Sequence, residues 1–387
     1  MEEVSFRQVV SRGCGIDVHQ KVAVATIGGE ALRTQTREFG TTTSSLTEMK
    51  EWLLGNGITH VAMESTGVYW KPVYNILEPS GIKVWIVNAR HIKYVPGHKT
   101  DKKDSAWICK LLLAGLLKPS YVPPKAQRNL RDLTRYRNKL VQNVASEKNR
   151  IIRILEDCNI KLSSVMSSTS GVTATKLIDK LCDGKVVTRE DIDEVYHGKL
   201  QCSKDDLYEA CQGFITDHHI FLLQTINRDI ESTESLISEL DSRIKESLSE
   251  YDNAMEVLRG IPGLNRKTVE DLIAEIGLDM SVFPTEKHLA SWAGEAAWAA
   301  TRTKNTFYSA RYHRLAARRG KKRALIAVGH SILKSVYHVL SGVEEYKELG
   351  ADYVNQRVEK RRRLYLKREL EKLGYDVQLT QQERQAG

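Results

Sequence analysis

Two carboxylates and three lysines lie close together in the segment 98–104. Asp101 and Asp104 are three residues apart, so on a helix their side chains would share one face. Two neighbouring carboxylates need a compensating cation, and a divalent metal ion is one that oxygen ligands bind well. The alternative is a solvated helix start, where acidic side chains interact favourably with the helix dipole. On this segment alone, the solvated helix start is the simpler interpretation.

Two further acids lie in segments that we predict to be strands. Asp17 lies between two β-branched residues in the apolar segment 14–28, and Glu64 lies near the end of the short segment 60–65. A buried strand seldom carries an acid without a role, because an unpaired buried charge is costly. Together with the two aspartates of 98–104, these acids are enough to hold two divalent ions. Such ions, Mg²⁺ or Mn²⁺, would stabilise both the attacking and the leaving oxygen when a phosphodiester undergoes in-line displacement.

The elements that must position these acids alternate between strands and helices over the first third of the chain. We predict strands at 14–28 (one strand or a tight hairpin), 33–39, 60–65 and 83–89, and helices at 43–54, 69–80 and 101–117. This alternation predicts an α/β domain with a mixed sheet, over residues 1–124. In an RNase H-like (RuvC-like) sheet the first and fourth strands are neighbours and the last helix crosses beside them. All four acids would then meet at one point.

Two long amphipathic helices follow Pro123-Pro124. We predict them at 126–157 and 217–249, with a Ser/Thr/Gly-rich loop at 163–174 between them. The apolar residues of the second helix alternate spacings of three and four, which is the pattern of a coiled coil. Residues 125–255 are therefore predicted to form an all-α antiparallel coiled-coil arm that serves dimerisation. The alternative is a plain helical hairpin packed on the core.

The segment 256–277 has the pattern of a helix-hairpin-helix, with Gly-Ile-Pro-Gly-Leu between two predicted helices. Backbone N–H groups at such a turn can bind phosphate. Arg259, Arg266 and Lys267 flank the turn and are predicted nucleic-acid contacts. The alternative is an ordinary corner between two helices that pack within the protein. Residues 256–387 are predicted to form a mostly helical C-terminal domain.

The distribution of charge favours nucleic acid as a partner. The formal net charge is +9, and residues 296–343 contain ten Lys or Arg but no Asp or Glu. A charge run is usually a solvated face, but a run this one-sided, with aromatic residues in it, suits a phosphate backbone. The predicted contacts in this run and beside the acids of 98–104 are Arg311, Arg314, Arg318, Arg319, Lys321, Lys322, Arg323, Lys99, Lys102 and Lys103.

Several protein classes are excluded by the composition. The six cysteines show no spacing typical of a zinc site and are interpreted as reduced thiols. No apolar run approaches the ~18 residues that a membrane span needs, and the N-terminal segment lacks the apolar core of a signal peptide. We therefore expect no membrane association and a cytoplasmic, nucleoid-associated location.

The acidic motifs resemble those of a known family. GIDVHQ around Asp17, AMESTG around Glu64 and HKTDKKDSAWI around Asp101 and Asp104 are similar to the motifs of DEDD-type transposases of bacterial insertion sequences, relatives of the pilin-gene invertases. The resemblance extends through GIPGLNRKTVEDLIAEIG and YHRLAARRGKKRALIAVGHSIL. It implies a RuvC-like catalytic domain, a coiled-coil arm, a C-terminal transposase domain and Mg²⁺. It also implies a homodimer or tetramer on DNA, a structured guide RNA (bridge RNA) that selects the DNA, and a serine nucleophile in the C-terminal domain.

The sequence departs from the family pattern at this serine. Trp292-Ala293-Gly294 runs directly into Glu295-Ala296, where the family has a loop and a serine motif. We interpret this as an internal deletion near 294–296, and no nucleophile serine is identified. The nearby hydroxyl residues are outside the family motif and receive no role; they are Ser291, Thr301, Thr303 and Ser309.

Three functions are consistent with these features. The first is a transposase that performs Mg²⁺-dependent strand transfer, with strand exchange weakened or lost by the missing serine motif. The second is a nucleic-acid-binding remnant or regulator without catalytic activity. The third is a RuvC-like metal nuclease that uses water as its nucleophile and needs no serine. Recombination activity separates the first two, and metal-dependent cleavage of branched DNA identifies the third.

Overall fold

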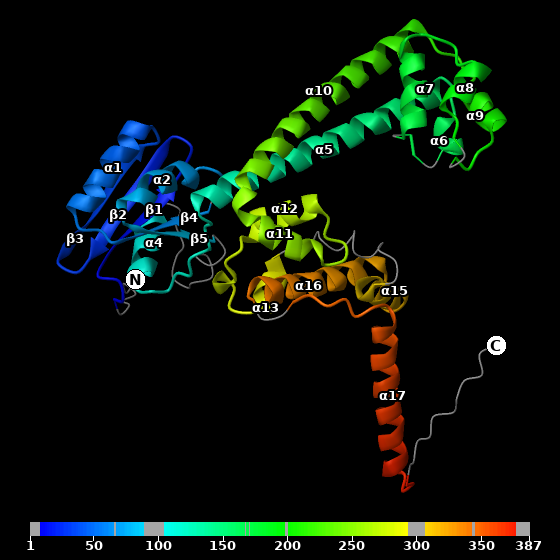
Figure 1. Ribbon diagram of the computed structural model, residues 1–387. Helices are drawn as coiled ribbons and strands as arrows, with labels where there is room; N and C mark the ends of the chain where they lie inside the picture. The colour runs from blue at the N-terminus through cyan, green and yellow to red at the C-terminus, as the bar shows by residue number, and fades with distance from the viewer. Residues whose placement is uncertain are drawn as a thin grey trace. The chain divides into compact units, whose positions relative to one another are not determined.

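The computed structural model divides the chain into two compact units on either side of the Pro123–Pro124 bond. It describes residues 8–65, 67–88, 104–166, 168–169, 171–197, 200–292, 306–342 and 345–376. Figure 1 shows the elements of each unit. The further division of the second unit into an arm and a C-terminal domain stays a prediction.

The first unit is built on a mixed five-stranded sheet with the order β3-β2-β1-β4-β5. The strands are β1 (Arg12–Val18), β2 (Val22–Gly29), β3 (Leu32–Gly40), β4 (His60–Glu64) and β5 (Lys83–Val87). The first three are antiparallel neighbours, whereas β4 is parallel to both β1 and β5. This topology is RNase H-like and confirms the predicted fold class, with the first and fourth strands side by side.

Helices cover both faces of this sheet. They are α1 (Thr43–Gly55), α2 (Trp70–Leu77), the short 3₁₀ helix η1 (Glu78–Ser80) and α4 (Asp104–Leu113). Cys14, Ile16 and Val18 of β1 belong to the core shared with α1 and α2, whereas Ala62 of β4 belongs to the core under α4. The last helix ends four residues before the predicted residue 117, because the chain turns at Gly115 with a left-handed φ of +69°.

The segment that we predict to be an arm contains two long antiparallel helices, α5 (Lys125–Asp157) and α10 (Asp217–Ser247). Ion pairs Arg137–Asp241 and Lys148–Glu234 show this direction, since the numbers rise on one helix and fall on the other. Of the predicted apolar seam of α10, four residues are fully buried: Leu223, Ile226, Ile230 and Ile244. The helices and their apolar stripe are therefore confirmed, while dimerisation stays a prediction.

In the described part of the chain between α5 and α10 there are four short helices. They are α6 (Leu162–Val165), α7 (Val172–Cys182), α8 (Arg189–Val195) and α9 (Lys204–Ala210). The predicted loop 163–174 is therefore wrong at both ends, where α6 and the first turn of α7 are helical. Thr173 and Ala174 are buried in a core of their own, so packing overrides the turn preference of this Ser/Thr-rich segment.

The remaining elements are helical, as predicted. They are η3 (Ser249–Tyr251), α11 (Asp252–Arg259), α12 (Arg266–Ile276), η4 (Met280–Val282), α13 (Glu286–Trp292), α15 (Phe307–Arg319), α16 (Lys321–Leu340) and α17 (Asp352–Lys372). Leu130 of α5 and Ile244 of α10 belong to the same core as α12 and α16. The base of the arm is thus part of the C-terminal core.

Within the described ranges, no helix is long and apolar enough to cross a membrane. The six cysteines are free thiols, as predicted.

Candidate metal site and nucleic-acid surfaces

Asp17 and Glu64 lie at the ends of two neighbouring parallel strands. Ile16 of β1 pairs with Met63 of β4, and continuing this register by one residue brings Asp17 opposite Glu64. Neighbouring strands are about 4.8 Å apart, and residues in register on parallel strands direct their side chains to the same face. The two residues therefore lie side by side on one face of the sheet.

This face is the one covered by α4. A Cβ atom on Gly15 would lie only 2.2 Å from the carbonyl oxygen of Ser105 in the first turn of α4. Asp17 is two residues further along β1 and faces the same side. Ala62, two residues before Glu64, packs with Ile108 of α4. Both predicted acids therefore lie on the α4 side of the sheet.

The first turn of α4 lies toward the end of the sheet that carries these acids. A Cβ atom on Gly13 would meet Leu112, near the end of α4, whereas one on Gly15 would meet Ser105, near its start. The helix therefore begins toward the carboxyl end of β1. Asp104 is its first residue and is exposed. The structure thus brings the segments of three predicted acids to one edge of the sheet.

Asp17 has a partner that the sequence reasoning missed. The Nε2 atom of His19 lies 2.9 Å from Oδ2 of Asp17, and the side chains are 64% and 25% exposed. The two residues are separated by one position at the end of a strand, so they share a face. The spacing Asp-x-His at a strand end is the signal that could have identified His19 as part of the site.

The donor set suits a hard divalent cation. Carboxylate oxygens are the ligands that Mg²⁺ prefers, usually one or two of them together with water and substrate phosphate. Within the described ranges, no group of three or more His, Cys, Asp or Glu side chains is arranged to hold a metal ion. A two-carboxylate arrangement at Asp17 and Glu64 is the one that the register supports. Asp101, Lys99, Lys102 and Lys103 lie outside the described residues.

The three predicted contacts around the hairpin turn are paired with acids. Arg259 bonds to Glu256 at 2.5 Å, Arg266 to Glu270 at 3.0 Å and Lys267 to Asp241 at 2.8 Å. The turn itself has Gly263 at a left-handed φ of +90°, and Asn265 caps α12 by accepting from the N–H of Thr268. These pairs neutralise part of the positive charge that the sequence suggested for this segment.

A buried ion network lies behind the hairpin. The Arg137 side chain is 1% exposed and bonds to Asp241 of α10 and to Glu270 and Asp271 of α12. Burial alone would lower the pKa of this guanidinium, but the three carboxylates raise it above its ordinary value. The network joins α5, α10 and α12 at the base of the arm.

The corner between α15 and α16 carries exposed positive charge. Gly320 connects the two helices with a left-handed φ of +80°. Five predicted contacts on either side of it are exposed: Arg318, Arg319, Lys321, Lys322 and Arg323. Arg311 and Arg314 are only half-buried, and the guanidinium of Arg311 lies 5.9 Å from the ring centre of Phe307. The five corner residues are therefore the better candidates for phosphate contacts.

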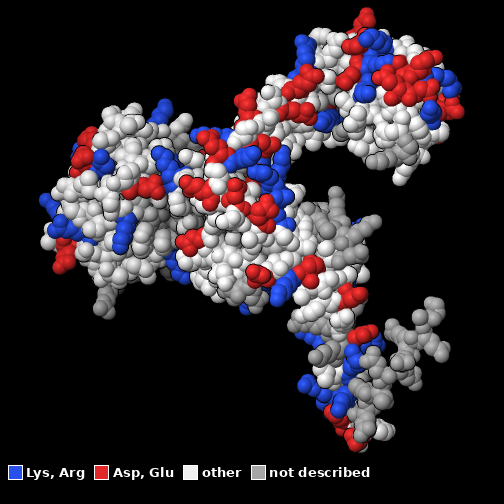
Figure 2. Space-filling view, in the orientation of Figure 1, with Lys and Arg blue, Asp and Glu red and all other residues white. Residues whose placement is uncertain are grey.

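Figure 2 shows a second concentration of Lys and Arg along α17, and mixed charges over the short helices of the arm. Among the described side chains of α17, the exposed basic residues are Arg361, Arg362, Arg363, Arg368 and Lys372.

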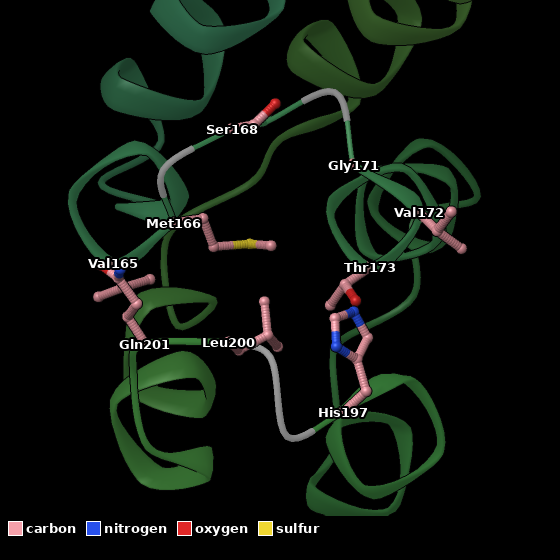
Figure 3. A pocket seen from close by; sticks show the side chains of 9 residues that line it. All are labelled: Val165, Met166, Ser168, Gly171, Val172, Thr173, His197, Leu200 and Gln201. Atoms are coloured by element: carbon pink, nitrogen blue, oxygen red, sulfur yellow. The ribbon is translucent and has the colours of Figure 1, made fainter. Parts of the chain in front are cut away.

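A cavity of about 250 Å³ lies among the short helices of the arm. Figure 3 shows Met166 and Leu200 directed into it, with Thr173 and His197 at one side. The hydroxyl of Thr173 donates to the carbonyl of Val195 at 3.0 Å. Among the described residues that line this cavity there is no carboxylate, so their composition is not that of a Mg²⁺ site.

Two models of one transposase family match this chain. A model for DEDD transposases of the IS110 type, described as a transposase, matches residues 14–160. A model described as a transposase of the IS116/IS110/IS902 family matches residues 255–299. Both matches cover segments that we identified from the acidic motifs and the hairpin.

RuvC of Thermus thermophilus is among the solved structures that are similar to this chain. The two are 16% identical in sequence with a TM-score of 0.21, and the match covers 29% of this chain and 83% of that chain. The fold assignment rests on the sheet topology instead. A comparison with curated proteins finds no match. The chain is therefore similar to transposases of the IS110 family over residues 14–160 and 255–299.

Proposed function

We propose that this protein catalyses metal-dependent strand transfer between DNA phosphodiesters, with Asp17, Glu64, Asp101 and Asp104 as the residues that bind divalent metal. The observation that carries the proposal is the placement of Asp17 and Glu64, which are in register on neighbouring strands and face the helix that begins at Asp104. The similarity of residues 14–160 and 255–299 to transposases supports the reaction class.

Mg²⁺ or Mn²⁺ bound there would supply positive charge to the transferring phosphoryl group and activate the attacking oxygen. The chain's own contribution is to hold two carboxylates at a fixed separation on a rigid sheet. His19 keeps one oxygen of Asp17 oriented through the 2.9 Å contact. Positioned carboxylates of this kind retain their geometry without reorganising during the reaction.

DNA is held, in this proposal, by positive charge on several segments. The exposed residues at the α15–α16 corner contribute most, because the hairpin residues Arg259, Arg266 and Lys267 already have acidic partners. Lys99, Lys102 and Lys103 are proposed to contact the phosphates next to the metal. We also propose that a structured guide RNA selects the DNA, that the protein forms a homodimer or tetramer through the arm, and that it is located at the nucleoid. A relation to the pilin-gene invertases is proposed from the family resemblance.

We further propose that the serine motif of the family is missing between Gly294 and Ala296. This proposal rests on the sequence, in which Trp292-Ala293-Gly294 runs directly into Glu295-Ala296. Without a serine, a covalent protein–DNA intermediate is not expected, and strand exchange should be weak.

A supercoiled-plasmid recombination assay with element ends, cognate RNA and Mg²⁺ tests this function. We expect nicked or cleaved DNA that depends on metal, little recombined product, and loss of all products in Asp17→Asn. Efficient recombination would contradict the missing serine motif, and cleavage by Asp17→Asn at the parent rate would contradict the metal site.

A water-using metal nuclease is the second candidate, and the same missing motif favours it, since the acids are present without their family nucleophile. It predicts Mg²⁺-dependent cleavage of branched DNA in the absence of RNA. If the protein binds nucleic acid but cleaves neither substrate, it is a non-catalytic remnant or regulator.

A further inference from the structure

A chain of three hydroxyl groups connects the sheet to the start of α4. The Oγ1 atom of Thr26 lies 2.8 Å from Oγ of Ser105 and 2.8 Å from Oγ1 of Thr36. Thr26 is 1% exposed and Ser105 is 4% exposed, so this contact is shielded from water. Ser105 immediately follows Asp104, one of the proposed metal ligands.

The glycine opposite this contact fixes how close the helix comes. Gly15 of β1 pairs with Thr26 of β2, so both lie under the first turn of α4. A Cβ atom on Gly15 would lie 2.2 Å from the carbonyl oxygen of Ser105 and 2.3 Å from the backbone nitrogen of Cys109. The helix backbone therefore rests directly on the strand backbone, which only glycine allows.

Contact with Gly15 sets the distance of α4 from the sheet, but apolar packing alone does not prevent the helix from sliding or rotating. A directional hydrogen bond does, because its strength falls when donor and acceptor move out of line. We propose that Ser105 and Thr26 are positioning residues that hold the first turn of α4, and with it Asp104, at the edge of the sheet that carries Asp17 and Glu64. This inference rests on the proposed metal site.

Loss of the Ser105 hydroxyl leaves Thr26 with Thr36 as a partner, so no buried polar group is orphaned. The Ser105→Ala variant should therefore fold. Changes to groups that orient a metal ligand reduce metal affinity by about ten-fold or more. We expect Ser105→Ala and Thr26→Val to bind Mn²⁺ about ten-fold more weakly, and Thr26→Ser, which keeps the hydroxyl, to bind like the parent.

The test is calorimetric titration of the full-length protein with Mn²⁺, together with the melting temperature of each variant without metal. Thr173→Val is the matched control, because it removes a buried hydroxyl that bonds to the Val195 carbonyl in the arm. It should change the melting temperature about as much as Thr26→Val and leave Mn²⁺ affinity unchanged. Asp17→Asn reports on the metal site itself.

The outcomes separate the two claims. Weak binding by Ser105→Ala and Thr26→Val, with parental binding by Thr26→Ser and Thr173→Val, supports the positioning role. Parental Mn²⁺ affinity in Ser105→Ala and Thr26→Val, with binding lost in Asp17→Asn, overturns the positioning role alone. Parental affinity in Asp17→Asn overturns the metal site and this inference with it.

A separate observation concerns α17, whose basic residues lie on a defined face. Arg361, Tyr365, Arg368 and Lys372 follow each other at spacings of four, three and four, so they share one side of the helix. Arg362 and Arg363 are turned away from it by about 100° and 200°. All four residues of the face are exposed. Among the side chains described on α17, the ion pairs are Lys367–Glu371 and Lys372–Glu369, which leave Arg361 and Arg368 without an acidic partner.

We infer that this face of α17 contacts the phosphate backbone of duplex DNA, an inference that rests on the proposed action on DNA. From Arg361 to Lys372 the face is about 16 Å long, a length of duplex that carries about nine phosphate charges. Two exposed arginines flank an exposed tyrosine there, and the opposite side carries Leu366 and Leu370 instead. The face therefore offers guanidinium groups in a row to a linear array of phosphates.

Anisotropy of a labelled DNA duplex, titrated at several salt concentrations, tests this surface. The double variant R361A/R368A should weaken binding and reduce the salt slope by about two, since each phosphate contact contributes about 0.9. R362A/R363A is the control with the same loss of charge on the same helix and should have a smaller effect. An equal loss of DNA affinity in both double variants overturns the face assignment. A labelled RNA hairpin is titrated in parallel, and if R361A/R368A loses affinity for this RNA but not for the duplex, the assignment to DNA is overturned. A parent protein that binds neither contradicts the proposed function.

Discussion

Arg137 of α5 donates a 2.5 Å hydrogen bond to Glu270 of α12, and both side chains are almost completely buried. Two further acids, Asp241 and Asp271, bond to the same guanidinium. A buried charge is tolerated when its hydrogen-bonding groups are satisfied in this way. The hairpin helix α12 is thus tied to both helices of the arm by one side chain.

Removing this guanidinium should destabilise the second unit strongly. Arg137→Ala leaves several carboxylates facing each other, one of them buried, so we expect a loss of about 3 kcal/mol or more in the free energy of unfolding. Denaturant unfolding followed by circular dichroism measures it. Arg150→Ala is the control, because the exposed Arg150 pairs with Glu147 one turn earlier on α5 and its loss should cost less than about 0.5 kcal/mol. Equal losses in the two variants would show that the network contributes no more than a surface pair.

The same network predicts a pH dependence. Burial tends to raise the pKa of Asp241, but hydrogen bonds from Lys267 and Arg137 outweigh it, and the pKa lies below its ordinary value. A carboxyl group with a lowered pKa in the folded state adds stability above its unfolded pKa of about 3.9, and this stability is lost as the pH falls through the folded value. Asp241→Asn should therefore reduce the pH dependence of the free energy of unfolding below about pH 4, measured by denaturant unfolding at a series of pH values.

Asp271 provides a control of opposite sign for this pH experiment. Burial raises its pKa despite its bonds to Asn138 and Arg137. A raised pKa removes stability as the pH rises. Asp271→Asn should therefore change the slope of the free energy of unfolding against pH in the direction opposite to that of Asp241→Asn. Identical profiles for the parent and Asp241→Asn would sink this prediction.

The sequence predicts the sheet well and the contacts between distant segments poorly. Segments such as 14–28 and 60–65 carry the β-branched and apolar pattern of strands, and this pattern is local. The contact between Thr26 and Ser105 joins residues 79 positions apart, so no periodicity indicates it. Arg137 appears in the sequence as one of many basic residues of a long helix, yet it is buried. Charge in the sequence does not reveal which basic residues have acidic partners.

The candidate site was predictable to a similar extent. Acids at strand ends are visible in the sequence, and the RNase H-like topology brings Asp17 and Glu64 together. The roles of Gly15 and Ser105 depend on how α4 packs on the sheet, which only the three-dimensional structure describes. The loop predicted at 163–174 was wrong over α6 and the start of α7, because burial of Thr173 and Ala174 outweighs local preference.

Gly15→Ala should disrupt the first unit. Its added methyl group would meet backbone atoms of α4, which cannot move aside as a flexible side chain can, so overpacking should cost about 3 kcal/mol or more. Gly55→Ala is the control, because a Cβ atom there would meet nothing within 4 Å. That change lies at the end of α1 and should be neutral or stabilising by up to about 1 kcal/mol. A thermal melt that ranks the two variants the other way would show that α4 does not rest on β1.

Exposed and paired arginines should differ in their contribution to DNA binding. Replacing Arg318 and Arg319 by alanine should weaken duplex binding and reduce its salt dependence, since both are exposed at the α15–α16 corner. Replacing Arg259 and Arg266 should have a smaller effect, because each is bonded to a glutamate. Filter binding at three salt concentrations compares the pairs. A larger effect of the hairpin pair would indicate that its acidic partners release it when DNA binds.

The most direct test of the metal site is anomalous scattering from a crystal of the protein soaked in Mn²⁺. We predict a peak between the carboxylates of Asp17 and Glu64, within about 2.0–2.3 Å of an oxygen of each, as expected for oxygen coordination of such ions. A peak elsewhere in the first unit, or none at a Mn²⁺ concentration that supports DNA cleavage, would contradict it.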